Sequence, residues 1–163
     1  MNFALFICFI ILQRLLELIV AKRNEKWARS RGAVEFGQNH YPYIIVLHTA
    51  FIISIVIEYF YKGGDLNHTL LFIFFVLILF KVWVIASLGK YWNTKILRIP
   101  GSAFIKKGPY KLIKHPNYFI VVCEIIIIPM VFNLFITAIV FSILNSIMLT
   151  VRIRKEDKVW AAE

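Results

Sequence analysis

The fold is decided by residues 117–151, which read NYFIVVCEIIIIPMVFNLFITAIVFSILNSIMLTV. These 35 residues carry a single charge, that of Glu124. A straight helix of this length would extend about 52 Å, which is too long for one crossing of a hydrocarbon layer of about 30 Å. Pro129 and Asn133 interrupt the run near its middle and predict a tight turn there. We therefore expect two membrane spans, at about 117–129 and 134–151, the first of them short.

Three further apolar runs precede this stretch, at about 2–21, 43–61 and 69–88. Each has roughly the 20 residues that one crossing needs. The first run has no basic region before it and no small-residue cleavage motif after it, so we interpret it as a span and not as a signal peptide. The sequence predicts an all-α, polytopic membrane protein with about five transmembrane helices in a single domain, residues 1–163.

The composition agrees with a membrane protein and excludes an ordinary soluble enzyme. Of the 163 residues, 60% are hydrophobic, and the mean hydropathy is +0.75. Soluble domains are roughly 45–50% apolar, and a chain this short has too little interior to hide the excess. Both cysteines, Cys8 and Cys123, lie in apolar runs without metal-ligand spacing, so we expect two buried hydrophobes and no metal site.

The basic residues are distributed unevenly along the chain. There are 19 Lys and Arg against 9 Asp and Glu, a net charge of +10. In a five-span arrangement, sixteen of the basic residues fall on one side, in the loop after the first span, the 90–116 connection and the C-terminal tail. The positive-inside rule then places the N-terminus outside and the C-terminus in the cytoplasm. This asymmetry accounts for the net charge, and no nucleic-acid recognition module is present.

Two charges inside the first run call for an explanation. Arg14 and Glu17 are three residues apart, so they share a helix face and can pair. Charges in a span usually mark a pathway, a pocket or a helix contact, although a structural pair near the interface fits equally well. For Lys81 and Glu58, in the next two spans, we favour structural roles.

Two histidines of the second span share roughly one face. His40 and His48 are eight residues apart, which is too far for one metal ion. Each fits either an ordinary interfacial histidine or part of a substrate pocket.

The polar segment richest in chemistry is 108–118, GPYKLIKHPNY. It combines a rigid turn, two tyrosines, a histidine and two lysines directly before a span. Pro116 suits the first turn of that span, which places His115 at the helix N-terminus, where exposed N–H groups attract anions. Glu124 should face protein or a wet cavity. Taken alone, the segment also fits an interfacial belt of Tyr and Lys with one buried Glu.

The C-terminal tail supplies a second charged set. Arg152 and Glu156 are four residues apart and share a helix face, and Asp157 is adjacent. In isolation this set would indicate a solvated helix at a membrane surface.

Together the two sets resemble the isoprenylcysteine carboxyl methyltransferase family. The matching pattern is Gly-Pro-Tyr at 108–110, Lys-His-Pro-Asn-Tyr at 114–118, a membrane hairpin, and Arg152, Glu156 and Asp157. Family members more often have Arg where this chain has Lys114, and often a second Glu where it has Asp157. The substitution of Lys for Arg keeps the positive charge but loses the planar guanidinium, which can donate two parallel hydrogen bonds.

The N-terminal half is similar to a bacterial branch of the same family. The similar features are Arg14 and Glu17, Arg23-Asn24, GAVEFG at 32–37, His40-Tyr41-Pro42, His48 and LGKYWNT at 88–94. Members of that branch in Gram-positive bacteria resemble enzymes that O-methylate alkylpyrones made by type III polyketide synthases.

The resemblance implies an S-adenosylmethionine-dependent O-methyltransferase. It implies a membrane fold without a Rossmann domain, a cytoplasmic cofactor pocket, and a lipophilic acceptor from the bilayer, either an alkylpyrone-type polyketide or a prenylcysteine-type carboxylate. The implied cofactor-binding residues are Tyr110, His115, Pro116, Tyr118, Glu124, Arg152, Glu156 and Asp157, and Arg152 and Glu156 are the implied catalytic pair. The substrate-binding candidates are Arg14, Glu17, His40, His48, Tyr91 and Trp92.

Two other functions stay open at this point. An NADPH-dependent membrane reductase of similar fold would use the cations of the tail, Arg152, Arg154, Lys155 and Lys158, but the Arg152–Glu156–Asp157 pattern favours the methyl donor. A scaffold or small transporter would leave the 108–118 segment and Glu124 unexplained.

Overall fold

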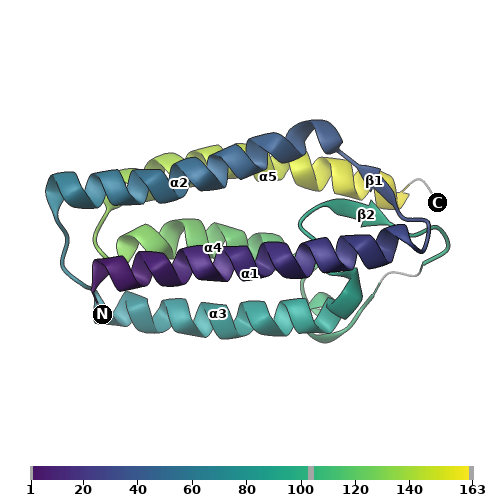
Figure 1. Ribbon diagram of the computed structural model, residues 1–163, viewed down its shortest axis with the longest axis horizontal. Helices are drawn as coiled ribbons and strands as arrows, with labels where there is room; N and C mark the ends of the chain where they lie inside the picture. Colours follow the sequence, from purple (N-terminus) through teal and green to yellow (C-terminus); the bar gives the residue numbers. More distant parts are fainter. Residues whose placement is uncertain (1, 103–104, 162–163) are drawn as a thin grey trace.

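Five helices run lengthwise in one bundle, and the polar connections gather at one end (Figure 1). The computed structural model describes residues 2–102 and 105–161. The helices are α1 (Phe3–Arg29), α2 (Tyr41–Lys62), α3 (His68–Leu88), α4 (Pro116–Met130) and α5 (Phe135–Ala161). The smaller elements are β1 (Val34–Phe36), β2 (Ile96–Arg98) and three 3-10 turns, η1 (Gln38–His40), η2 (Gly89–Tyr91) and η3 (Gly108–Lys111).

Helix length and composition confirm the predicted all-α, polytopic membrane architecture. Helices α1, α2, α3 and α5 are each long and apolar enough to cross a membrane, whereas α4 is a shorter apolar helix of 15 residues. At 1.5 Å per residue, α4 rises only about 22 Å. Helices α1 and α5 continue beyond the apolar runs at 2–21 and 134–151, and their extra turns lie at the polar end of the bundle (Figure 1).

The turn between α4 and α5 lies where the sequence predicts it. Helix α4 ends at Met130, and Asn133 takes a left-handed conformation with φ of 58°, which asparagine tolerates. The Asn133 side chain donates a hydrogen bond to the carbonyl of Asp65, 3.1 Å away, in the loop after α2. Gly64 of that loop lies so close that an added Cβ would be 2.1 Å from the Phe132 carbonyl oxygen. The two connections therefore pack directly on each other.

Glu58 has the structural role that we favour from the sequence. Its carboxylate is buried and accepts hydrogen bonds from the backbone N–H groups of Ile136 (3.1 Å) and Thr137 (2.7 Å). These groups belong to the first turn of α5, whose free N–H groups and dipole favour a negative charge. Glu58 thus fixes the start of α5 against α2.

The apolar core lies at the end of the bundle away from the polar connections. Phenylalanine rings from several helices meet there, mostly edge to face, as in the pairs Phe6–Phe74 (5.1 Å between centroids) and Phe3–Phe132 (5.2 Å). This packing brings α1, α3 and the α4–α5 turn together, and the backbone N–H of Asn67 at the start of α3 also donates to the Val131 carbonyl (2.8 Å).

Four ionised side chains form a buried network in the middle of the bundle. Arg14 lies 2.9 Å from Glu124 and 3.3 Å from Glu17, and Lys81 lies 2.6 Å from Glu124 and also contacts Glu17. Gln13 donates to both carboxylates. The two cations and two anions balance, which is what an interior surrounded by lipid requires. The predicted Arg14–Glu17 pair is therefore confirmed as part of a larger network that joins α1, α3 and α4.

Removal of one charge from this network should destabilise the bundle more than removal of two opposite charges. Glu124→Gln leaves two cations facing one carboxylate, and we expect a loss of about 3–5 kcal/mol in the free energy of unfolding in detergent micelles. The double variant Glu124→Gln/Lys81→Met restores neutrality and should recover part of that loss. Equal losses in the single and double variants would contradict a role for charge balance.

Candidate functional site

The segment between η2 and β2 is held against α1 by buried asparagines. The Asn24 side chain donates to the carbonyls of Gly89 (3.0 Å) and Trp92 (2.8 Å), and Asn93 donates to the carbonyl of Ala21 (2.9 Å). An amide that satisfies two buried carbonyls fixes both the path and the register of the segment. Trp92 is thereby buried at the polar end of the bundle.

A small two-stranded sheet, formed by segments far apart in the sequence, extends this polar end. Strands β1 and β2 pair antiparallel, with Glu35 opposite Leu97. Lys95, beside β2, lies 2.9 Å from Glu25 and 3.5 Å from Glu35, and Arg29 contacts the same two carboxylates. The hydrogen bond to Glu25 raises the pKa of Lys95, so this ammonium stays charged. The sequence patterns did not predict this sheet, because each of its two strands has only three residues.

The turn η3 packs against α3 through a glycine. Gly108 has φ of 51°, and a Cβ at this position would lie 2.3 Å from Ser87 Oγ and 3.2 Å from Trp83 Nε1. Only glycine fits both the backbone and the space. The turn places Tyr110 at the polar end, where burial raises the pKa of its hydroxyl, so the ring stays neutral.

The two motif segments meet where α4 begins beside the last turns of α5. The Tyr118 hydroxyl donates to Glu156 and accepts a hydrogen bond from Arg152 Nε at 2.9 Å. Arg152 also donates to the Thr94 carbonyl, and its guanidinium lies 5.4 Å from the centre of the Tyr118 ring. His115 stacks on that ring, with 5.3 Å between centroids.

Arg152 is unusual among the cations of this chain. It is buried, with 8% of its surface exposed, and its hydrogen-bond partners are a hydroxyl and a carbonyl. Across residues 2–102 and 105–161, no carboxylate lies within ion-pair distance of its guanidinium. A buried cation held by neutral groups suits an anionic ligand.

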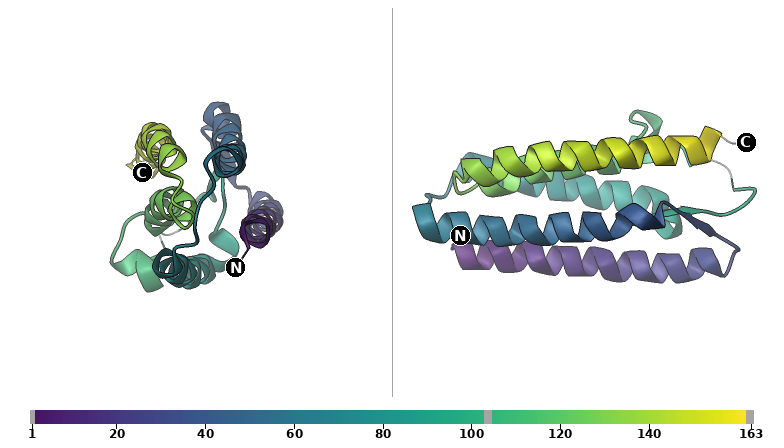
Figure 2. Two further views of the ribbon diagram at one scale, coloured as in Figure 1. Left: turned by 90° about the vertical axis from the view of Figure 1, so that its left-hand side faces the viewer. Right: turned by 90° about the horizontal axis from the view of Figure 1, so that it is seen from above.

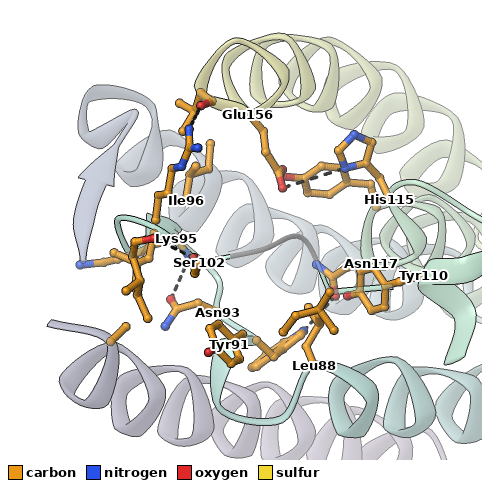
Figure 3. A pocket seen from close by; sticks show the side chains of 18 of the residues that line it. Leu88, Tyr91, Asn93, Lys95, Ile96, Ser102, Tyr110, His115, Asn117 and Glu156 are labelled. Carbon is orange, nitrogen blue, oxygen red and sulfur yellow. Dashed lines mark hydrogen bonds and ion pairs between the residues drawn. The ribbon is translucent and has the colours of Figure 1, made fainter. Parts of the chain in front are cut away.

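A cavity of about 1070 Å³, including its open mouth, lies at the polar end of the bundle; we call it the end cavity. Figure 3 shows side chains from separate segments around it: Tyr91 and Asn93 after α3, His115 and Asn117 at the start of α4, and Glu156 on α5. Tyr110, Tyr118 and Arg152 also line it. The mixture of aromatic rings, a carboxylate and cations is suited to a polar, zwitterionic ligand.

A second cavity, of about 1100 Å³ including its open mouth, lies among the helices; we call it the inner cavity. Its polar lining includes Arg14, Glu17, His48, Lys81 and Asn145. Most of the remaining lining is apolar and comes from α1, α2, α4 and α5. Four residues, Trp92, Asn117, Tyr118 and Arg152, line both cavities and form a shared wall between them.

Most of the residues singled out in the sequence lie at one of the two cavities. Those at the end cavity are Tyr91, Trp92, Tyr110, His115, Tyr118, Arg152 and Glu156, and those at the inner cavity are Arg14, Glu17, His48, Trp92, Tyr118 and Arg152. Asp157 lies beside the end cavity, 3.2 Å from His115 and 2.7 Å from Lys114.

Three of the residues singled out in the sequence are not among the residues that line either cavity. Glu124 lines neither cavity and is completely buried in the ion network, so we assign it to that network and not to a cofactor. Pro116 is the buried first residue of α4 and orients His115 instead of facing the cavity. The side chain of His40 lies outside the described part of the structure, which places only its backbone, in η1.

Sequence reasoning missed several lining residues. Asn117 and Thr94 lie within segments that were quoted for other reasons, and Asn145 sits in the middle of an apolar run. Asn145 could have been predicted from the sequence, because an amide inside an apolar span needs a polar neighbour when it is buried. No sequence pattern identifies Lys95 or Ser102, since only the fold brings their loop over the cavity.

The fold and the site define a polytopic helical membrane protein with a polar ligand cavity at one end. The family model described as isoprenylcysteine carboxyl methyltransferase (ICMT) family matches residues 69–162, from α3 through the end of α5. The chain belongs to this family of membrane methyltransferases, whose members generally use S-adenosylmethionine as methyl donor.

Two curated bacterial proteins are similar over nearly the whole chain. The uncharacterized protein YpbQ of Bacillus subtilis is 45% identical over 159 residues, which cover 96% of this chain and 95% of that protein. An uncharacterized protein of Haemophilus influenzae is 28% identical over 158 residues, which cover 93% and 90% of the two chains.

The close approach of Gly108 to α3 can be tested with a matched glycine. Gly108→Ala should destabilise the protein by more than Gly101→Ala, because both glycines have positive φ but only Gly108 would meet Ser87 and Trp83. We expect the backbone to account for about 1 kcal/mol in each case, and the clash to add about 1–3 kcal/mol at Gly108. Thermal unfolding in detergent measures both, and equal shifts would contradict the packing of η3 on α3.

Proposed function

We propose that this protein is an S-adenosylmethionine-dependent O-methyltransferase that acts on a lipophilic substrate at the membrane, with residues 1–163 as one domain. The observation that carries the proposal is the pair of cavities. The end cavity is lined by polar family-motif residues, the inner cavity lies among the spans, and Tyr118 and Arg152 of the motifs form part of their shared wall. A polar donor on one side and an amphiphilic acceptor on the other would meet there.

The residues of the end cavity fit the charges of S-adenosylmethionine, which would supply a methyl group activated by a sulfonium. His115 and the positive end of the α4 dipole suit its carboxylate. Glu156 suits its ammonium or ribose hydroxyls, with Asp157 beside it. The faces of Tyr110 and Tyr118 suit the adenine and the positively charged sulfur.

The chain's role in the reaction is mainly to align two groups. Methyl transfer is an in-line displacement that depends on proximity and orientation. The acceptor oxygen, a carboxylate or an acidic enol hydroxyl, is nearly anionic at neutral pH and needs no strong base. Arg152 is buried in the shared wall without a carboxylate partner among the described residues, so its guanidinium can hold a negatively charged oxygen in place.

The acceptor class is proposed from the family resemblance. An alkylpyrone-type polyketide and a prenylcysteine-type carboxylate both combine an oxygen nucleophile with a long apolar tail. The orientation is proposed from the basic residues: with the N-terminus outside and the C-terminus in the cytoplasm, the end cavity would open toward the compartment that contains the methyl donor.

Calorimetric titration with S-adenosylhomocysteine in detergent tests the cofactor assignment. We expect Glu156→Gln and His115→Ala each to weaken binding about 10- to 100-fold, because each removes a charge-assisted contact. Asp65→Asn and His68→Ala, at the opposite end of the bundle, are matched controls and should bind like the unchanged protein.

The same titration with NADPH distinguishes the proposed methyltransferase from an NADPH-dependent reductase. A folded protein that binds NADPH and not S-adenosylhomocysteine would contradict the methyltransferase proposal. The charge of the end cavity does not decide between the two ligands, because the cations Lys95, Arg98, Lys114 and Arg152 line it beside the single carboxylate of Glu156, so the titration itself is the test.

A further inference from the structure

We propose that the acceptor's polar head hydrogen-bonds His48 in the inner cavity while its apolar tail leaves the bundle between α1 and α2. This inference rests on the proposed methyltransferase function and adds the entry route and the residue that holds the acceptor. It assigns α1 and α2, both of which precede the region matched by the family model, to acceptor binding.

The packing of the helices points to the entry route. Helix α4 packs along α3 and α5, and α2 packs along α5. In the described part of the chain, α1 is not in a closely packed pair with any other helix, and it meets α2 at the far end of the bundle, where Phe3 stacks on Tyr59 with 3.6 Å between ring centroids. The end-on view of Figure 2 shows α1 and α2 as separate columns on the same side of the bundle. The inner cavity nevertheless takes lining residues from both helices, so it lies at the seam between them.

The residues at this seam suit an alkyl chain. Leu18 of α1 and Ile45 of α2 both line the inner cavity, yet 48% and 49% of their surfaces are exposed on the outside of the bundle. In a membrane this exposure is to lipid. A continuous apolar surface therefore runs from the bilayer into the cavity, whose inner wall is polar.

Among the described residues that line this cavity, His48 has a buried ring nitrogen that makes no hydrogen bond. The cations Arg14 and Lys81 are held by carboxylates in the ion network. The Nδ1 atom of His48 is buried and has no hydrogen-bond partner among the described residues. Leaving such an atom unpaired is unfavourable, and a hydrogen bond between the imidazole and an oxygen of a bound head group would offset that cost.

The position of His48 also suits an amphiphile. It lies seven residues after Tyr41, the first residue of α2, which corresponds to a depth of roughly 10 Å below the polar end. A head group at this depth lies beside the shared wall formed by Tyr118 and Arg152, where the methyl group would arrive.

Kinetics with defined probes tests the role of His48. We use long-chain 4-hydroxy-6-alkyl-2-pyrone and N-acetyl-S-farnesylcysteine as acceptors, with labelled S-adenosylmethionine. His48→Leu should raise the acceptor KM about tenfold, a loss typical of one hydrogen bond, and leave S-adenosylhomocysteine affinity within about twofold. His48→Asn, which keeps hydrogen-bonding groups, should recover most of the loss. Unchanged acceptor KM in both variants, or equal loss of cofactor affinity, would overturn the role.

Bulky substitutions test the entry route. Leu18→Trp and Ile45→Trp should raise the acceptor KM about fivefold or more by filling the seam. Leu79→Trp on α3 and Ile139→Trp on α5 are matched controls, because both side chains face lipid and neither lines the inner cavity. Equal effects at all four positions would overturn the route.

A photoreactive probe separates failure of this inference from failure of the proposed function. The same two acceptors, with a diazirine at the tail end, should label α1 and α2 saturably, even if no methyl group is transferred. Labelling that is absent, or spread over the lipid-facing sides of α3 and α5, would overturn the route whatever the activity of the protein.

Discussion

The bundle depends on ion pairs between its own helices, because the surrounding lipid offers charged side chains neither water nor counter-ions. Arg14, Lys81, Glu17 and Glu124 come from three helices, and none of them could remain ionised there alone. Their network fixes the depth and rotation of α1, α3 and α4 relative to one another, which apolar packing against equally apolar lipid specifies less sharply. Because Arg14 and Glu17 also line the inner cavity, the contact that orders the bundle shapes the cavity wall as well.

The two cavities follow from a difference in length between the helices. Helix α4 has only 15 residues, whereas α1 and α5 continue past the apolar region for several turns. The space above the short helix is covered by the polar 89–115 connection, whose described part is fixed by Asn24 and Gly108, and this becomes the end cavity. The space beside it, between α1 and α2 and on the polar side of their Phe3–Tyr59 contact, becomes the inner cavity. Arg152 stands at their junction because the last turns of α5 pass the start of α4.

Hydropathy predicted the helices because each span must be almost entirely apolar, and Pro129 with Asn133 predicted the turn because they favour a chain reversal. Helical spacing predicted the Arg14–Glu17 pair, and motifs predicted His115, Tyr118, Arg152 and Glu156 at one place. The contacts of Glu124 could not be predicted, because its partners Arg14 and Lys81 lie on two other helices that no local pattern connects to it. The two-stranded sheet of β1 and β2, the place of Asn117 in the shared wall and that of Thr94 in the inner cavity arise only from tertiary packing, which leaves no periodic signal.

The central claim is that the two cavities serve one reaction across their shared wall. The most direct test is the transfer of radiolabel from methyl-labelled S-adenosylmethionine into the organic-soluble products of a lipid extract. The account predicts label in the organic phase with the unchanged protein and loss of that label with Arg152→Ala. Thermal unfolding in detergent checks that both proteins are folded under the assay conditions. Binding of S-adenosylhomocysteine with no transfer of label to any organic-soluble acceptor would contradict it.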